Sequence, residues 1–186
     1  RSIGMTFEKT VTLKDGRNCL LRNGVTSDGK AVLDVFNRTH EETDYLLTYS
    51  DENCFTASQE ADFLQRKTDS TNTVEIIAIV DGVVAGTAGI DALGMRDKIK
   101  HRAVFGIAIT KEFWGLGIGK YLMEACIECA REAGYLQLEL EVVAENERAV
   151  EMYKRAGFIE YGRNPEAFRL RTGEYQELID MRLELK

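Results

Sequence analysis

The sequence contains only one proline, Pro165, among 186 residues, and it has no internal repeat or low-complexity tract. Nothing in the composition therefore marks a linker between domains. No apolar run approaches the roughly 20 residues that are needed to span a bilayer. With 44% apolar and 30% charged residues, the chain has the profile of a soluble globular protein of one domain.

Basic residues are too few to give the chain a positive charge. There are 24 Lys and Arg against 31 Asp and Glu, so the formal net charge is −7. Non-specific binding to nucleic acid or to an anionic membrane requires a basic surface. We therefore expect neither nucleic acid nor a membrane as a partner. The same charge is compatible with a cationic substrate.

Metal-binding and redox patterns are also scarce. The only histidines are His40 and His101, and the C-x-x-C pair Cys126 and Cys129 has no second pair at metal-ligand spacing. Both cysteines lie well inside a helical pattern, away from a helix start, where the dipole would activate a thiol. We expect them to pack in the core, and we expect no metal site.

The N-terminus, Arg1-Ser2-Ile3-Gly4-Met5, carries no secretory signal. Residues 1–4 read as the remnant of an expression tag, with Met5 as the natural start. We therefore expect a single domain over residues 5–186 in the reducing cytoplasm.

Hydrophobic periodicity predicts a mixed α/β protein with helices on both faces of its sheet. The expected order is two strands, two helices, three strands, a helix, a strand, a helix and two strands. The first helix is expected to start at Ser27 or Asp28, the second to run from Ser58 to about Arg66, and the fourth to start at Asn146. The expected strands are 7–13, 18–22, 74–80, 83–90, 101–110, 136–142, 158–162 and 175–185.

The stretch FWGLGIGKYLM, residues 113–123, places three glycines directly after a strand and at the start of a helix. A Walker A loop would need a glycine at Trp114 and a hydroxyl residue for Mg²⁺ at Tyr121, so that interpretation fails. A dinucleotide fingerprint can use Gly115, Gly117 and Glu139, but it requires a small residue where Lys120 stands. A tight turn without a ligand remains the plain alternative.

A helix N-terminus is nevertheless a good anion site. Its first N–H groups have no partner within the helix, and the dipole favours negative charge. Glycines let the backbone approach a pyrophosphate without a Cβ clash. The physical prediction is a phosphate-bearing ligand at the start of this helix.

Two stretches in sequence, GIAITKEFWGLGIGKYL and NERAVEMYKRAGF, resemble the GNAT superfamily of acyl-CoA-dependent N-acyltransferases. The loop matches the family's pattern from Trp114 to Gly119 except at its first position, where Trp114 replaces Gln or Arg. The second stretch matches at Asn146, Ala149, Tyr153, Arg155, Gly157 and Phe158. The resemblance implies a mixed, mostly antiparallel twisted sheet of about seven strands, and acetyl-CoA as the co-substrate.

By the same resemblance, the pantetheine arm lies along the strand end at 107–109 and separates that strand from the next. A main-chain N–H there would stabilise the developing oxyanion. The implied cofactor-binding residues are Ile107, Ala108, Ile109, Trp114, Gly115, Leu116, Gly117, Ile118, Gly119, Lys120, Asn146, Ala149, Tyr153 and Arg155. Asn146 is also an ordinary N-cap residue.

Tyr153 is the expected catalytic residue. The resemblance places its phenol, of ordinary pKa about 10, beside the departing thiolate, whose conjugate acid has a pKa near 8.5. The alternative is an aromatic residue that packs in an amphipathic helix. A general base is harder to assign, because Val104 stands where many relatives carry a glutamate. The candidates are Glu139 and Glu141, which lie on one face of their strand. The alternative is that these two residues are only a charged pair at a solvated edge of the sheet.

The acceptor is expected to be a primary amine of a small molecule or peptide. The acidic and aromatic stretch THEETDYL, residues 39–46, can attract a cationic amine or simply form a solvated face. The resemblance also allows a homodimer. Two other functions stay open, namely a non-catalytic acyl-CoA-binding module of the same fold and, less favoured, a nicotinamide-dependent oxidoreductase.

Overall fold

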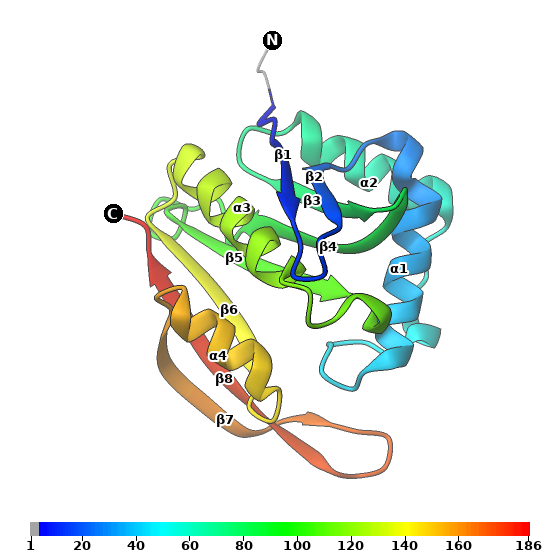
Figure 1. The fold of residues 1–186 in the computed structure, drawn as a ribbon. Helices are drawn as coiled ribbons and strands as arrows, with labels where there is room; N and C mark the ends of the chain where they lie inside the picture. Colours follow the sequence, from blue (N-terminus) through cyan, green and yellow to red (C-terminus); the bar gives the residue numbers. More distant parts are fainter. Residues whose placement is uncertain (1–3) are drawn as a thin grey trace.

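A computed structural model describes residues 4–186, which form one eight-stranded sheet in the order β1-β2-β3-β4-β5-β6-β8-β7 (Figure 1). Only β5 and β6 pair in parallel, and all other neighbours are antiparallel. The mixed, mostly antiparallel sheet is therefore confirmed, with eight strands rather than about seven. The strands are β1 Glu8–Thr12, β2 Asn18–Asn23, β3 Val74–Val80, β4 Val83–Ala92, β5 Arg102–Ile109, β6 Gln137–Val143, β7 Ile159–Arg169 and β8 Tyr175–Glu184.

Residues 1–3 lie outside the described part of the chain, and with them most of the expected tag remnant. Four α-helices cover the sheet, as expected, on both faces (Figure 1). They are α1 Gly29–Glu42, α2 Ala57–Asp69, α3 Ile118–Glu132 and α4 Glu147–Arg155, with the short 3-10 turns η1 Thr26–Asp28, η2 Ser50–Glu52 and η3 Lys111–Phe113. Among the described residues, no helix is long and apolar enough to cross a membrane.

The alternation of side chains along β3 explains why both faces are covered. Ile76 and Ala78 point into the main core with α3, while Ile77 and Ile79 pack with Val32 of α1 and the second helix. A strand that is apolar on both faces, as β3 is from Ile76 to Val80, must bury both faces. This pattern places α1 and α2 on one side of the sheet and α3 on the other.

The start of α2 differs from the prediction. The N-cap is Thr56, not Ser58, and its hydroxyl accepts a hydrogen bond from the Gln59 N–H at 3.2 Å. The Gln59 side chain in turn accepts from the Thr56 N–H at 2.8 Å. This capping box satisfies two donors at once, which a single serine at position 58 cannot do.

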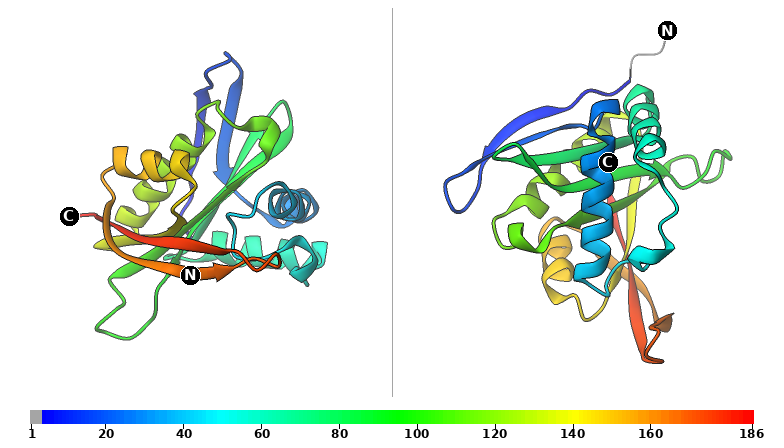
Figure 2. Two further views of the ribbon diagram at one scale, coloured as in Figure 1. Left: turned by 90° about the horizontal axis from the view of Figure 1, so that it is seen from below. Right: turned by 90° about the vertical axis from the view of Figure 1, so that its right-hand side faces the viewer.

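The last hairpin is longer than predicted, because β7 runs to Arg169 rather than ending at residue 162. Its register against β8 shifts twice, between Glu160 and Gly162 and between Asn164 and Phe168. Bulges such as these bend a strand and tolerate a proline within it. The hairpin projects from the sheet in orange and red (Figure 2), and Arg171 at its tip contacts Asp51 in the segment that follows α1.

Candidate active site

The two parallel strands at the middle of the sheet separate after a short contact. Their pairing covers only Arg102 to Val104 on β5 and ends at Val104 opposite Glu139 on β6. Both strands continue beyond this point and diverge (Figure 1). A cleft of about 1590 Å³ lies between their separated ends, the start of α3 and helix α4. A pantetheine arm between the two strands, as the sequence resemblance implies, requires such a split in the sheet.

The glycine loop forms one wall of this cleft. Gly115 and Gly117 adopt φ values of 79° and 95°, which side-chain-bearing residues rarely reach. Gly117 is the N-cap of α3, and the first helical bond runs from the Tyr121 N–H to its carbonyl. The N–H groups of residues 118–120 therefore have no partner within the helix. They provide the donors of an anion site.

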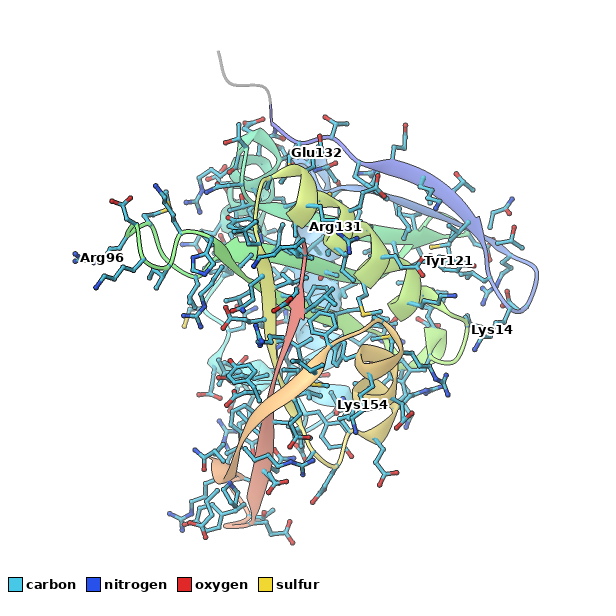
Figure 3. All side chains as sticks on the ribbon, turned by 90° about the vertical axis from the view of Figure 1, so that its left-hand side faces the viewer. Lys14, Arg96, Tyr121, Arg131, Glu132 and Lys154 are labelled. Carbon is cyan, nitrogen blue, oxygen red and sulfur yellow. The ribbon has the colours of Figure 1, made fainter. Side chains whose placement is uncertain are left out.

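The β1–β2 hairpin supports this loop, and the sequence analysis did not foresee it. The Lys14 N–H donates to the Leu116 carbonyl at 3.1 Å, and the Arg17 guanidinium lies 5.6 Å from the Phe113 ring centroid. The Lys14 side chain lines the cleft close to Gly117. Figure 3 shows Lys14 at the hairpin tip, on the same side as Tyr121 in the first turn of α3. A contact between residues a hundred positions apart leaves no local sequence signal.

Trp114 folds back over the end of β5. Its indole Nε1 donates to the Ile109 carbonyl at 2.8 Å, and the residue is 41% exposed. The indole thus occupies a main-chain acceptor at the cleft wall. The indole provides apolar surface there, whereas the Gln or Arg that is usual at this position of the GNAT loop would provide a polar group.

The backbone of β5 offers specific hydrogen-bonding groups to the cleft. Leu93 N–H bonds to the Arg102 carbonyl, and Thr110 N–H bonds to the Ala85 carbonyl at the other end of the same ladder. In an antiparallel ladder, the residues that bond to one neighbour alternate along the strand. Even-numbered residues such as Ala108 therefore bond to β4, while the main-chain groups of Ile107 and Ile109 point toward the split.

Tyr153 of α4 lines the cleft and is only 5% exposed. Its ring packs edge-on against Phe105, with the centroids 6.1 Å apart, and lies 5.7 Å from Phe158. Burial raises the pKa of the Tyr153 phenol above its ordinary value. Within residues 4–186, no hydrogen bond to its hydroxyl is present. The ring of Tyr153 therefore packs in the core, while its hydroxyl remains, among these residues, a hydrogen-bond donor without a partner at the cleft.

The other expected residues of α4 also lie at the cleft wall, among them Ala149 and Arg155. Asn146 is the N-cap, but its side chain makes no cap hydrogen bond and is available to a ligand. Arg148 was not foreseen. It lines the same wall, with its guanidinium 3.0 Å from where a Cβ on Gly115 would lie.

The two candidate glutamates have different surroundings. Glu139 is 6% exposed, forms a two-pronged ion pair with Arg102, and is absent from the cleft lining. The Tyr161 hydroxyl also donates to it, at 3.4 Å. Glu141 lines the cleft and is exposed there. The structure thus separates a carboxylate held in the sheet from one that faces the cleft.

The far end of the cleft is formed by the segment after α1 and the β7–β8 hairpin. Tyr45, Leu46 and Leu47 line it together with Phe168 and Leu178. Of the 39–46 stretch, Thr39 is 2% exposed, and its hydroxyl donates to the Val35 carbonyl at 2.8 Å. The start of that stretch is therefore part of the helix, and only its end reaches the cleft.

No group of three or more His, Cys, Asp and Glu side chains within residues 4–186 is arranged to hold a metal ion. Cys126 and Cys129 are free and at most 1% exposed, which confirms their expected packing. Burial raises the pKa of both thiols, that of Cys129 to about 12.

The split sheet and the glycine loop at its edge define a class of protein that binds a phosphate-bearing ligand across a divided sheet. Residues 32–158 match the family model described as the acetyltransferase (GNAT) family. An L-amino acid N-acetyltransferase, AaaT, of Escherichia coli K12 is 32% identical over 118 residues, or 63% of this chain and 72% of that protein. The chain therefore belongs to the GNAT family of acetyltransferases.

Solved structures agree with this assignment. A GNAT-family acetyltransferase from Streptococcus pneumoniae matches with a TM-score of 0.85 and 28% identity, over 89% of this chain and 99% of that one. A GNAT superfamily phosphinothricin acetyltransferase from Sinorhizobium meliloti, in complex with acetyl-CoA, matches with a TM-score of 0.78 over 94% and 89% of the two chains. At 17% identity, this second likeness concerns the fold alone.

Proposed function

We propose that the protein is an acetyl-CoA-dependent N-acetyltransferase that acts on a primary amine of a small molecule or peptide. The observation that carries the proposal is the split between β5 and β6, with an anion-binding helix start at one end. A pyrophosphate-bearing thioester and an amine can meet in this split from opposite faces of the sheet. We further propose the cytoplasm as its compartment and residues 5–186 as its single domain.

The residues at the loop fit the chemistry of coenzyme A. The free N–H groups at the start of α3 match a pyrophosphate, and Lys14, Lys120 and Arg148 line the cleft around them. The main-chain groups of Ile107 and the Ile109 N–H match the amides of an extended pantetheine arm, much as an added strand would, while the Ile109 carbonyl is held by Trp114. The Asn146 amide adds a side-chain partner for the same arm.

Acetyl-CoA would supply a thioester whose carbonyl carbon an amine attacks directly, with the thiolate as the leaving group. The Tyr153 hydroxyl is the donor for that sulfur. Because burial raises its pKa, the phenol stays protonated at neutral pH and can donate a hydrogen bond to a thiolate. A main-chain N–H of Ile107 or Ile109 would stabilise the charge that develops on the thioester oxygen.

The amine must lose a proton before it attacks. Glu141 is the better placed of the two glutamates, since it lines the cleft and Glu139 is engaged by Arg102. We propose that Glu141 accepts this proton, directly or through a water molecule, and that Glu139 holds the closed end of the split together.

The competing function is a non-catalytic acyl-CoA-binding module of the same fold. Release of the free thiol from acetyl-CoA across a panel of amines separates the two, with mass spectrometry to identify the acetylated product. If at least one amine is acetylated, with one molecule of acetylated product for each thiol released, the protein is an enzyme. Binding of acetyl-CoA with no amine-dependent thiol release would support the module instead.

A further inference from the structure

The wall of the cleft at its acceptor end is a segment without secondary structure of its own. Residues 44–48, between α1 and η2, contribute Tyr45, Leu46 and Leu47 to the cleft lining, and we call them the acceptor wall. Within residues 4–186, no backbone–backbone hydrogen bond involves the acceptor wall. Leu47 is 79% exposed, so packing does not fix the segment either. A segment of this kind keeps its position through the contacts at its two ends.

The first of these contacts joins the end of α1 to the start of η3. A carboxylate oxygen of Glu42 accepts a hydrogen bond from the Lys111 N–H at 3.1 Å. One turn earlier on α1, Arg38 forms an ion pair with Glu112 at 3.1 Å. Because η3 leads directly into the glycine loop, these contacts fix one end of the acceptor wall to the donor side of the cleft.

The second contact is made by Arg171, at the turn of the β7–β8 hairpin. Its guanidinium binds both carboxylate oxygens of Asp51, at 3.0 and 2.8 Å, and lies 4.0 Å from the Tyr49 ring centroid. Its backbone N–H donates to the Tyr49 hydroxyl at 3.0 Å. We call this group of contacts the Arg171 clasp. It holds the other end of the acceptor wall to the hairpin.

The hairpin forms the opposite side of the acceptor end. Its residues Phe168 and Leu178 line the cleft together with the acceptor wall, and the same two parts of the chain line a smaller pocket beside it. Within residues 4–186, Arg171 makes every hydrogen bond and ion pair that joins residues 43–52 to the hairpin. The geometry of the acceptor end therefore depends on this single residue.

We propose that Arg171 is a positioning residue for the acceptor, because its clasp holds residues 44–48 in the place from which they contact the acceptor. The inference rests on the proposed N-acetyltransferase function. Without the clasp, the wall occupies its binding position for a smaller fraction of the time, and the apparent affinity for the acceptor falls in proportion to that fraction. Glu42 still holds the end of the wall that lies next to the glycine loop. The acceptor KM should therefore rise, while kcat and the affinity for CoA stay unchanged.

The test compares Arg171→Gln with Arg163→Gln. Arg163 pairs with Glu160 and Glu177, which both belong to the same hairpin, so the control removes an equal charge and leaves the acceptor wall untouched. The acceptors are leucinamide, phenylalaninamide and whichever amine of the panel is acetylated fastest. At saturating acetyl-CoA, Arg171→Gln should raise the acceptor KM about threefold or more, with kcat and the calorimetric CoA affinity within about twofold of the wild type. Arg163→Gln should change none of these quantities.

Two further measurements distinguish positioning from a general loss of stability. Asp51→Asn should also raise the acceptor KM, and the double variant should lose no more than Arg171→Gln alone, since both changes break one clasp. Both partners of the ion pair are exposed, so salt screens their attraction. The ratio of the acceptor KM of Arg171→Gln to that of the wild type should therefore fall as the salt concentration rises from about 0.05 to about 0.5 M.

Proteolysis measures the clasp without turnover. Chymotrypsin can cleave after Tyr45, Leu46 or Leu47 once the acceptor wall has left the surface, and such cleavage follows the population of the open form. Cleavage within the wall, located by mass spectrometry, should be about threefold faster or more in Arg171→Gln than in the wild type. Arg163→Gln should be cleaved there at the wild-type rate.

The outcomes separate the two proposals. If no amine releases thiol from acetyl-CoA, the proposed enzyme is refuted, and chymotrypsin cleavage still decides whether the clasp holds the acceptor wall. If amines are acetylated but Arg171→Gln leaves the acceptor KM unchanged, or lowers kcat or CoA affinity instead, the positioning role alone is overturned. Equal effects of Arg171→Gln and Arg163→Gln on KM or on cleavage overturn it as well, and so does a KM ratio that salt does not change.

Discussion

Replacing Tyr153 by Phe removes one hydroxyl and keeps the ring. The ring packs against Phe105 and Phe158, and its hydroxyl makes no hydrogen bond within the described residues. The free energy of unfolding should therefore change by less than about 1 kcal/mol. A hydrogen bond to a charged group contributes about 1.5–3 kcal/mol. If Tyr153 donates to the departing thiolate, the rate of transfer should fall about 10- to 150-fold.

Single-turnover thiol release measures this step directly, since it separates transfer from product release. Calorimetry should give the same CoA affinity for the variant within about twofold. Burial raises the pKa of Tyr153 above 10, so deprotonation of the phenol should not reduce wild-type activity below about pH 10. A variant that transfers acetyl groups as fast as the wild type would refute the role of Tyr153. A loss explained entirely by weaker CoA binding would refute it as well.

Three further predictions concern the cleft and the core. Lys14→Gln should weaken CoA binding about 3- to 10-fold at low salt and by less at high salt. The control is Lys154→Gln on α4, outside the cleft lining (Figure 3), which should leave CoA binding unchanged. If calorimetry gives equal losses of affinity for the two variants, Lys14 does not contribute to the CoA site. Glu141→Gln should lower kcat/KM about 100-fold at pH 7, with partial recovery as the pH approaches the pKa of the amine, and an unaltered pH–rate profile would exclude it as the base. A thiol reagent should modify Cys54 rapidly in the native protein and the three buried cysteines only on unfolding; rapid reaction of more than one thiol would contradict their burial.

Local patterns were enough to predict most of the central fold. The apolar run of β3 and the glycine stretch before α3 carry strong short-range signals, and both elements appear where the sequence placed them. The extent of β7 could not be predicted in this way. Its polar residues around Pro165 become a strand only because β8 pairs with them across two register shifts.

The candidate site shows the same division. The loop and the α4 residues follow from sequence motifs, whereas Lys14 reaches the cleft through the turn between β1 and β2, about a hundred residues before the loop that it contacts. The sequence also treated Glu139 and Glu141 as equivalent, because they share one strand face. The register between β5 and β6 distinguishes them, because it pairs Arg102 with Gln137 and lets its guanidinium reach the diagonal neighbour Glu139.

The central claim is that the cleft between β5 and β6 binds the acyl donor through the start of α3. Calorimetric titration with acetyl-CoA tests it most directly, with NAD as the matched nucleotide control. The account predicts one acetyl-CoA per chain and no binding of NAD. It also predicts weaker acetyl-CoA binding in Gly117→Val, where a β-branched residue cannot adopt the φ of 95°. No measurable affinity for acetyl-CoA, or binding that Gly117→Val leaves unchanged in a folded protein, would contradict it.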